Sequence, residues 1–445
     1  MSSKSFQNAS NLNGIVSVLQ FGAVGDGVTD DAPIIQAAAT AAAASGKTLF
    51  FPAGNYRLLS YLTLPSNTDW LGEIGTKFYL DPTMTLGPTI GGTQRAISSS
   101  GTQNIRLNSI EFYSAKTGLT KAITICFEDV TSISISNCIF RTFGNATYYA
   151  QGLVIFNSTS IHITKSVFTD CSGDGAALSN NCSQFFVSNN EFTNNADWGF
   201  VASIGCSKGT VSGNLFYNNT STATGVDRCI EVSFVGNIIS NNEHGIRIAK
   251  FAATAEVNQD IAITGNVIKN SQVAAISVED TFSIGLISIS GNTISGSSNQ
   301  GIRVSNATCV SIVGNSIYSC IAEAILFEAV ASGKETGRST VIGNKTTTST
   351  YGVRQITGSG TTSKITVVGN NFSECSVSAT GLLNADKIDG DTSPDYFSFS
   401  KTIEFPSGIY SATANTGAVT PPAQVWGFLP VYFSGVLKKI PVYNE

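Results

Sequence analysis

The chain has 445 residues, of which only 12% are charged, against roughly 25% in an average globular protein. The formal net charge is −5, whereas a nucleic-acid-binding protein normally has a basic excess, so we expect no nucleic acid partner. No apolar stretch is long enough to cross a membrane, and residues 1–20 show no secretory signal pattern. We therefore expect synthesis in the cytoplasm without membrane insertion.

Nine cysteines are present, an odd number that includes no Cys-x-x-Cys pair. We expect free thiols that pack as small apolar side chains, in a chain made in a reducing compartment. The sequence also lacks a phosphate-binding loop and the usual spacing of metal ligands. We therefore predict no cofactor and no metal, with a calcium site of carboxylates as the alternative.

Residues 1–20 form a lead segment that precedes the first recognisable element. A helix is predicted next, because Asp30 and Asp31 are good N-cap residues, Pro33 suits the first turn, and the Ala-rich run that follows favours helix. Strand-like sequence, KTLFFPAGNYRLL, comes after it. We interpret residues 21–100 as a cap with the first turns of the structure, because stacked strands with an open end would pair with other chains.

A short motif recurs through the middle of the chain. Two apolar residues flank a polar one, and Gly-Asn and an apolar pair follow, as in ITGNVI at Ile263. Degenerate copies included, the position held by Asn recurs every 23 to 29 residues, at positions 110, 138, 166, 190, 214, 237, 266, 292, 315, 344 and 370. Such a period indicates a stack of repeats rather than separate domains.

Each copy alternates apolar and polar residues with the period of a strand, and a second short strand that opens with Gly follows in most copies, as in GIRIA at Gly245. Copies of this length are too short for a strand–helix unit, so their strands must stack in parallel. We predict an all-β solenoid, a parallel β-helix of about 11 recognisable coils, over residues 101–385. The recurring Asn then forms a structural column, because stacked amides hydrogen-bond one another.

The stretch FGAVGDGVTDDAPIIQAAATAAAASGKTLFFPAGNYRL, from Phe21 to Leu58, resembles the N-terminal signature of the pectate-lyase-like superfamily of right-handed β-helix proteins. Polygalacturonase-type glycoside hydrolases, some C5-epimerases and many phage tailspike depolymerases share that signature. With the repeats, the resemblance covers about residues 15–385. It implies a right-handed coil and a carbohydrate partner, and the tailspike branch implies a homotrimer.

The repeat stops near Leu383, and a polar linker, NADKIDGDTSPDYFS, leads into β-rich sequence. We expect residues 386–445 to form a small C-terminal β module, which resembles terminal modules of phage tail and virion-associated proteins. This resemblance implies a virion-associated or extracellular location for the mature protein.

Equivalent residues of neighbouring coils lie about 4.8 Å apart, so acids distant in sequence can form columns. We align the copies on the Gly that opens the second strand. The first set stands directly before this Gly and consists of Asp174, Trp198, Arg228 and His244. The second set stands two residues before it and consists of Asp197, Asp227 and Glu243. The third set stands two residues after it and consists of Glu231, Arg247 and Arg303. Strand parity places the last two sets outside the coil, whereas the first set faces outward only if the Gly marks a bend.

Stacked carboxylates repel one another, and catalysis is one reason to keep them together. Cleavage of a glycosidic bond needs a proton donor and a second carboxylate, about 5.5 Å apart for retention or about 6.5–9.5 Å for inversion. Coil spacing places Asp197 about 5 Å from Asp227 and roughly 6 Å from Asp174. We predict that the catalytic residues come from Asp174, Asp197, Asp227, Glu243 and His244, with turn or surface roles as the alternative.

Substrate-binding candidates surround these acids. Aromatic rings can stack on sugar faces, and cations and carboxylates can bind hydroxyls along a groove. The candidates are Trp198, Tyr148, Tyr149, Arg228, Glu231, Arg247 and Arg303. Core packing or a solvated surface is the alternative for each.

The polygalacturonase branch carries its acids in the motif order NTD, DD, GHG and RIK, on successive coils. This chain offers SGDG around Asp174, ADWG around Asp197 and EHGIRIAK around His244. The second motif has Trp198 in place of an acid, and a coil with Asp227 intervenes before His244. The resemblance therefore implies the fold more firmly than galacturonan hydrolysis.

Three hypotheses about function stay open. The first is an endo-acting glycoside hydrolase of the tailspike type that degrades a bacterial surface or cell-wall polysaccharide. The second is a polysaccharide lyase or epimerase on a uronate-containing glycan, which needs a basic side chain and charge neutralisation from residues such as His244, Arg247 and Lys250. The third is a non-catalytic receptor-binding adhesin or structural virion protein, in which the carboxylates lie too far apart to work as a pair.

Overall fold

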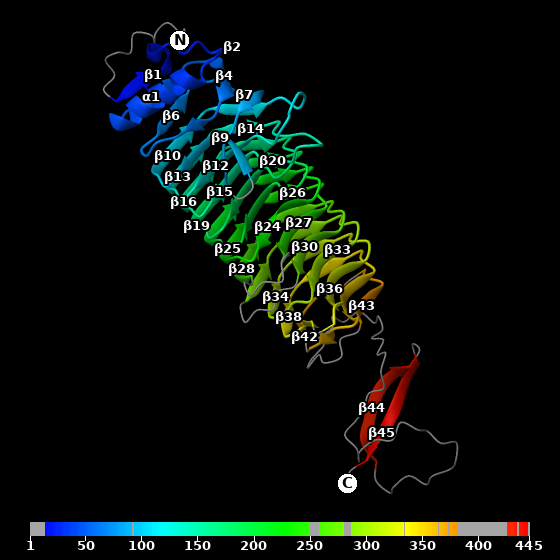
Figure 1. The fold of residues 1–445 in the computed structure, drawn as a ribbon. Coiled ribbons are helices and arrows are strands. Elements are labelled where there is room, and N and C mark those ends of the chain that lie inside the picture. The colour runs from blue at the N-terminus through cyan, green and yellow to red at the C-terminus, as the bar shows by residue number, and fades with distance from the viewer. Residues whose placement is uncertain are drawn as a thin grey trace. The chain divides into compact units, whose positions relative to one another are not determined.

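The computed structural model describes residues 14–90, 93–249, 258–279, 286–332, 334–363, 365–372, 374–380, 425–433 and 436–443. Lys250 and residues 1–13 and 381–424 lie outside the described residues. The chain divides into two compact units, residues 1–398 and 399–445. The first unit is a right-handed parallel β-helix, which confirms the predicted fold (Figure 1).

Three long parallel sheets run along the coils, and most coils contribute one strand to each sheet. Sheet A consists of β1 (Ile15–Ser17), β3 (Thr48–Phe51), β6 (Asp69–Gly72), β10 (Gln103–Asn108), β13 (Thr131–Ser136), β16 (Thr159–Thr164), β19 (Ser183–Ser188), β22 (Ser207–Ser212), β25 (Ile230–Val235), β28 (Gln259–Thr264), β31 (Ile287–Ser290), β34 (Val310–Val313), β38 (Ser339–Ile342) and β42 (Ile365–Val368).

Sheet B consists of β2 (Asp26–Asp30), β4 (Gly54–Ser60), β7 (Thr76–Thr85), β11 (Glu111–Ser114), β14 (Ile139–Arg141), β17 (Val167–Thr169), β20 (Glu191–Thr193), β23 (Leu215–Tyr217), β26 (Ile238–Ser240), β29 (Val267–Lys269), β32 (Thr293–Ser295), β35 (Ser316–Tyr318) and β39 (Lys345–Thr347). Its strands are short because one left-handed residue turns the chain at the end of most of them.

Sheet C consists of β5 (Leu62–Thr63), β9 (Thr93–Ser100), β12 (Thr124–Glu128), β15 (Leu153–Phe156), β18 (Ala176–Ser179), β21 (Phe200–Ser203), β24 (Thr222–Asp227), β27 (His244–Ala249), β30 (Ala274–Glu279), β33 (Gln300–Ser305), β36 (Glu323–Ala329), β40 (Tyr351–Thr357) and β43 (Val377–Thr380), and β8 (Gly87–Ile90) joins β9 in antiparallel orientation. A two-stranded parallel sheet, β37 (Glu335–Thr336) with β41 (Thr361–Thr362), lies beside the last coils.

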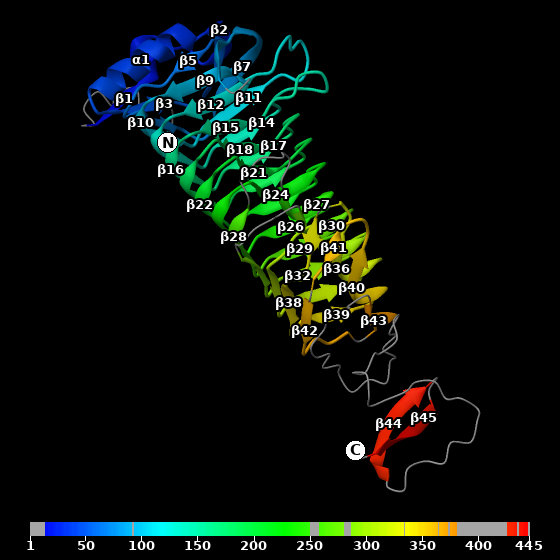
Figure 2. The same cartoon turned by 60° about the horizontal axis from the view of Figure 1, so that its bottom comes forward.

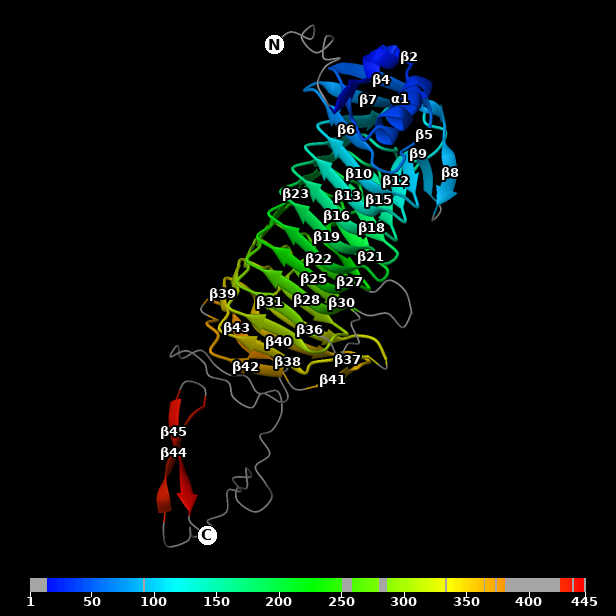
Figure 3. The same ribbon diagram turned by 90° about the vertical axis from the view of Figure 1, so that its left-hand side faces the viewer.

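A short 3-10 helix, η2 (Val18–Phe21), and the predicted helix, α1 (Ala32–Ala44), lie at the N-terminal end of the coils (Figure 3). The buried face of α1 is almost entirely alanine, which lets the helix lie close to the first coil. The expected N-cap bond is absent, because the Asp31 carboxylate instead accepts hydrogen bonds from the backbone of Val24 and Gly25. Asp30 bonds the backbone N–H of Ala32 in its place.

The core is built from columns of one residue type. Phenylalanines of sheet B stack along the axis with ring centroids 4.8 to 5.3 Å apart, at Phe78, Phe112, Phe140, Phe168, Phe192 and Phe216. This spacing is the coil repeat, so regular pairing brings the rings into contact, and their burial adds to the hydrophobic stabilisation of the core.

The recurring asparagines form the predicted ladder between sheets A and B. Each side chain donates to the amide oxygen of the next one and to a backbone carbonyl, and accepts from the backbone of the previous one, as at Asn266. The regular part of the ladder is Asn190, Asn214, Asn237, Asn266, Asn292, Asn315, Asn344 and Asn370, all buried. A second, shorter ladder joins Asn195, Asn219 and Asn242. These amides satisfy the backbone at the corners of the coil.

All nine cysteines are free, and seven of them are buried, as expected. Burial raises the pKa of Cys138 and Cys171 to about 12, so these thiols are poor nucleophiles. No group of three or more His, Cys, Asp or Glu side chains is placed to hold a metal ion within the described ranges.

The second unit contains an antiparallel hairpin of β44 (Val425–Phe433) and β45 (Val436–Tyr443). The predicted C-terminal module begins at residue 386, and its segment up to residue 424 lies outside the described residues. Within the part of the chain that the structure describes, no helix is both long and apolar enough to cross a membrane.

The ladder leads to a stability prediction. Asn266→Ala removes two contacts in which the side chain accepts and three in which it donates, so we expect a loss on the order of 3 kcal/mol from the unsatisfied partners. Thr264→Ala, at an exposed position of the same coil, is the control and should cost less than about 0.5 kcal/mol. Urea denaturation measures both, and equal midpoints would contradict the structural role of the ladder.

Candidate functional site

The glycines that open the strands of sheet C decide which residues face outward. A Cβ on Gly175 would lie 2.9 Å from the amide nitrogen of Asn195 and 3.0 Å from Cβ of Phe168, so this glycine points into the filled core. The following residue, Ala176, is fully buried as well. Because two successive residues face inward, the residue before the glycine turns outward, and the bend on which the prediction depended is present.

The outward column before these glycines runs along neighbouring strands of sheet C. Backbone hydrogen bonds and strand register align Gln151, Asp174, Trp198, Thr222, His244, Ala274, Gln300 and Glu323. Strands β15, β18, β21, β24 and β27, which carry or follow the first five, lie side by side (Figure 2). The predicted alignment is therefore correct for this column except in one coil.

The exception is the coil with β24, where the predicted register is wrong. Ala223 takes the place of the opening glycine in this coil. The sequence alignment instead put Cys229, six residues later, at the glycine position. Asp227 pairs with Ser203, six residues beyond Asp197 and up to roughly 20 Å from it along an extended chain. Asp227 is therefore no neighbour of Asp197 in one column.

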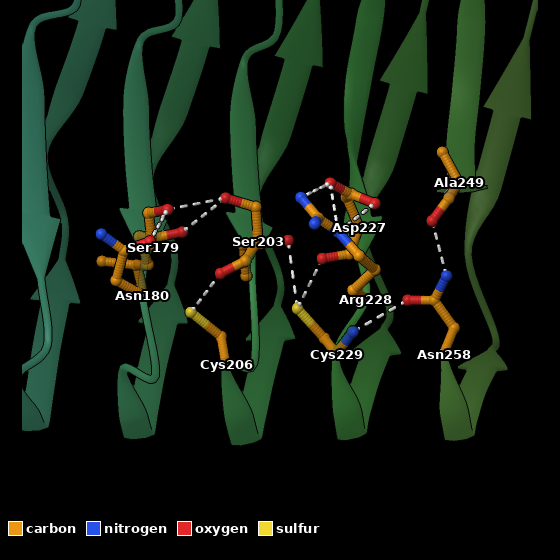
Figure 4. Close-up of polar contacts among 11 residues, drawn as sticks. Ser179, Asn180, Ser203, Cys206, Asp227, Arg228, Cys229, Ala249 and Asn258 are labelled. Carbon is orange, nitrogen blue, oxygen red and sulfur yellow. Dashed lines mark hydrogen bonds and ion pairs between the residues drawn. The ribbon is translucent and has the colours of Figure 1, made fainter. Parts of the chain in front are cut away.

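The slip also removes Arg228 and Glu231 from the predicted columns. Arg228 sits at the turn after β24, with a left-handed φ of 60°, and Glu231 belongs to β25 of sheet A. The Arg228 guanidinium holds both oxygens of Asp227 at 2.8 to 3.1 Å (Figure 4). Both side chains are nearly buried, so this pair fixes the end of a strand.

Asp174 lies in a buried hydrogen-bonding pocket on the outer face of sheet C. Its carboxylate accepts from Nε2 of Gln151 at 2.8 Å and from the backbone N–H of Trp198 in the next coil at 3.1 Å. Only 5% of the residue is exposed. Burial raises the pKa of Asp174 to about 7, against the hydrogen bond from Gln151, and the charge of Asp197 adds to the rise.

Asp197 stands one residue before Trp198, so its carboxyl group is a neighbour of Asp174 across the coil boundary. It is only half-buried and accepts a hydrogen bond from the Tyr149 hydroxyl at 3.2 Å. Burial raises its pKa, while hydrogen bonds from Tyr149 and Ser221 and the charge of Arg247 oppose the rise. We infer that Asp197 ionises before Asp174 as the pH rises.

Tyr149 joins the two acids. Its hydroxyl donates a hydrogen bond to Asp197 at 3.2 Å, and its ring lies against Gly173, the residue before Asp174, where a Cβ would be 2.6 Å from Cζ. Burial of the hydroxyl and the charges of both carboxylates raise the tyrosine pKa, so the phenol stays protonated. The pair and the tyrosine form a compact group whose members come from three successive coils.

Further along the face, cations and carboxylates alternate. Arg247 contacts Glu279 at 2.7 Å, and Arg303 contacts Glu279 at 3.4 Å and Glu328 at 2.6 Å. Burial alone would raise the pKa of Glu279, but the bond from Arg247 and the charges of both arginines lower it. This ladder is charge-balanced at neutral pH.

His244 lies beside this ladder and is 5% exposed. Burial and the positive charge of Arg247 lower its pKa, so the imidazole is neutral at pH 7. Its Nδ1 has no hydrogen-bond partner in the described ranges, which leaves an unused polar atom next to the candidate site.

The remaining predicted residues take different positions. Trp198 packs its indole over Gly225 and is 6% exposed, so it offers no ring face to solvent, and Tyr148 is half-buried against the core. Glu243 lies in the same column as Asp197 but two coils further on, and Ser221 occupies the coil between them. The structure thus brings Asp174, Asp197 and Tyr149 together.

Three partners of the site are absent from the sequence prediction, namely Gln151, Ser221 and Glu279. Gln151 directly precedes the opening Gly152, so the column that contains Asp174 points to it. Ser221 is hidden by the slipped register of its coil, since Ala223 replaces the glycine that would have located it. Glu279 is the last residue of β30 and pairs with Arg247, because a largely buried carboxylate needs a cation beside it.

With this geometry in hand, comparison with known proteins identifies the family. A family model described as "Rhamnogalacturonase A/epimerase, pectate lyase-like" matches residues 15–247, more than half of the chain. The chain belongs to this family. The match to the rhamnogalacturonase A/epimerase family includes the acids and Tyr149, and a second model, for a "Periplasmic copper-binding protein (NosD)", matches residues 252–336.

Two curated proteins match short stretches. The chain is 44% identical over 59 residues to a glucan 1,3-beta-glucosidase of Cochliobolus carbonum, and 54% identical over 46 residues to mannuronan C5-epimerase AlgE3 of Azotobacter vinelandii. These stretches are 13% and 10% of this chain, and they span only 8% and 2% of the two relatives.

Solved structures of the same fold include enzymes and a phage protein. The A-module of mannuronan C-5 epimerase AlgE6 of Azotobacter vinelandii superposes with a TM-score of 0.59 at 20% identity, over 84% of this chain and 100% of that one. The catalytic unit of a GH87 alpha-1,3-glucanase of Streptomyces thermodiastaticus has a TM-score of 0.59 at 17% identity, over 81% and 69%. Bacteriophage phi29 gene product 12, in its pre-mature form, superposes with a TM-score of 0.57 at 17% identity, over 80% of this chain and 52% of that one. At such identities the likeness establishes the fold alone.

The buried acid predicts a stability effect with a defined pH window. An unfolded Asp ionises near 3.8, whereas Asp174 ionises near 7 when folded, so stability falls as the pH rises between these values. Above that window the fold carries an unfavourable buried charge, on the order of 2–4 kcal/mol at 1.36 kcal/mol per pKa unit. Asp174→Asn should remove this charge and raise the urea midpoint at pH 8 more than at pH 5.

The matched control for this comparison is Asp260→Asn, at an exposed position of sheet A. Its midpoint should stay close to that of the unchanged chain at both pH values. An Asp174→Asn midpoint that shifts equally at both pH values would show that the acid is not buried in its charged form.

Proposed function

We propose that this protein is an endo-acting glycoside hydrolase in which Asp174 is the proton donor and Asp197 is the base or nucleophile. The observation that carries the proposal is the pair of carboxylates on adjacent coils: the backbone N–H of Trp198, directly after Asp197, donates to Asp174, and the Tyr149 hydroxyl donates to Asp197. Burial separates their proton affinities, and a site with one protonated and one ionised carboxyl group suits glycosidic cleavage.

The proposed chemistry follows from these protonation states. Asp174 gives its proton to the glycosidic oxygen as the bond to the anomeric carbon breaks. Asp197, ionised, either activates a water molecule or attacks the anomeric carbon, and stabilises the positive charge that develops there. Proton transfer from Asp174 leaves a buried carboxylate beside the Gln151 amide, which hydrogen-bonds it.

The substrate that we propose is a bacterial surface or cell-wall polysaccharide. Support comes from the family and from the fold shared with a glucanase catalytic unit and with phage gene product 12, which also supports the proposal of a virion-associated homotrimer. Glu243, Arg247 and Arg303 are proposed to bind sugar hydroxyls along sheet C, beside the acids. Asp227, Arg228 and Glu231 have no part in this site.

The first test is loss of cleavage. Asp174→Asn and Asp197→Asn should each reduce the release of reducing ends from a susceptible polysaccharide by at least about a hundredfold, the usual size of a general acid–base contribution. Asp170→Asn, four residues before Asp174 and at the surface, is the matched control and should keep full activity. The Asp227→Asn variant should also keep its cleavage activity, measured per folded molecule. Retained activity in both Asp174→Asn and Asp197→Asn would refute the assignment.

The pH dependence of cleavage is a second test. Because burial raises the pKa of Asp174 to about 7 and also raises that of Asp197, kcat/KM should be bell-shaped with its maximum on the acid side of neutrality. The alkaline limb should fall near pH 7, where Asp174 loses its proton. A rate that keeps rising well above neutral pH would contradict this division of roles.

A lyase or epimerase is the competing enzyme. Such an enzyme needs a base for the proton beside the uronate carboxylate, and a cation that neutralises this carboxylate. Arg247 and Arg303 are both engaged by Glu279, and burial keeps His244 neutral but nearly inaccessible, so these residues support hydrolysis better. In the cleavage assay, new absorbance from unsaturated uronate would indicate elimination. Tight binding without new reducing ends would indicate an adhesin.

A further inference from the structure

Asp174 faces outward from sheet C and yet is almost fully buried. Gln151 and the Trp198 backbone surround its carboxylate at the level of the sheet. Tyr149 is the neighbour that reaches the surface, since 52% of the residue is exposed while its ring lies against Gly173 and its hydroxyl donates to Asp197. The phenol therefore lies in the place where a glycosidic oxygen would have to approach Asp174.

The backbone on the N-terminal side of Tyr149 is held firmly. The Asn145 side chain accepts hydrogen bonds from the backbone N–H groups of Thr147 and Tyr148 at 2.9 Å. The carbonyl of Tyr148 accepts from Asn145 at 3.1 Å and from the Ser172 hydroxyl at 2.8 Å. Tyr148 also packs against the core, so this side of the loop is anchored to the next coil.

The C-terminal side is anchored in the same way. The backbone N–H of Ala150 donates to the Ser172 hydroxyl at 3.0 Å, and the carbonyl of Ala150 accepts from Gly173 at 2.9 Å. Ala150 is buried, so a movement of the loop as a whole would break these contacts on both sides of Tyr149. The Tyr149 side chain rests on Gly173, which has no side chain to hold the ring.

We infer that Tyr149 is a side-chain gate, which closes over Asp174 through its hydrogen bond to Asp197 and its ring contact with Gly173, and opens by rotation of its own side chain on a fixed loop. The inference rests on the proposed function, in which Asp174 must reach the substrate. Closed, the gate keeps water from the proton of Asp174, and a glycan enters by taking over the hydrogen bonds of the phenol. Tyr149 is thus a positioning residue and no sugar platform.

The gate can be tested without a substrate, by chemical labelling of carboxyl groups. The full chain is treated at pH 5 with a water-soluble carbodiimide and an amine, and the labelled peptides are quantified by mass spectrometry. Asp170, in the same coil and 39% exposed at its side chain, is the internal reference. In the unchanged protein Asp174 should label much more slowly than Asp170.

Three variants separate the hydroxyl from the ring. Tyr149→Phe should speed the labelling of Asp174 roughly tenfold, the order expected when one or two hydrogen bonds that hold the closed rotamer are lost. Tyr149→Ala should speed it further, and Gly173→Ala should do the same by displacing the ring. Labelling of Asp170 should stay unchanged in all three, which also reports that the coils remain folded.

The outcomes distinguish the gate from the proposed function. The gate is overturned, whatever the enzyme does, if Asp174 in the unchanged protein labels as fast as Asp170. It is also overturned if Tyr149→Ala leaves the labelling of Asp174 unaffected. Faster labelling in the variants, in a protein that cleaves no polysaccharide, would keep the gate and refute the hydrolase. Where a polysaccharide is cleaved, Tyr149→Phe should retain kcat within about tenfold, because the phenol moves no proton of the substrate. A loss as large as that of Asp174→Asn would make Tyr149 catalytic and overturn the gate.

Discussion

Identical register between successive coils is the constraint on which the rest of this structure depends. Because each coil repeats the backbone path of the one before, a residue type at one position meets its own kind in the next coil. A buried polar residue then needs a donor and an acceptor at once, one for each neighbour, and the amide of Asn266 has both. An apolar column such as that of Phe168 needs only regular spacing.

The candidate site arises from the same register and works against it. Stacking brings Asp174 against the coil of Asp197, although two carboxylates in a poorly hydrated place repel each other. The conflict is resolved when one of them keeps its proton, and burial favours the protonated form of Asp174. A rigid stack of coils on either side tolerates such a destabilising group, as enzymes commonly do at their active sites.

The sequence was sufficient to predict the features that recur in every coil. It was insufficient for features that occur in one coil or one loop only. The Gly-Asn motif located the ladder and the strands of sheets A and B, and the opening glycines aligned Asp174 with Trp198 and His244. In the coil of β24 the glycine is Ala223, so the alignment failed there and placed Asp227 six residues out of register. The contact between Tyr149 and Asp197 depends on a loop path that no period encodes.

The outer face of sheet C combines a fixed part and a movable part, and the charges explain the difference. Arg247, Glu279 and Arg303 alternate in sign from strand to strand, so Glu279 is held by an arginine on each side. Like charges in one column would repel, so this alternation is the arrangement that in-register stacking allows. At the acids, burial favours the protonated form of Asp174, and the neutral phenol of Tyr149 donates a hydrogen bond to Asp197. Because the phenol carries no charge, its departure leaves no unpaired cation behind.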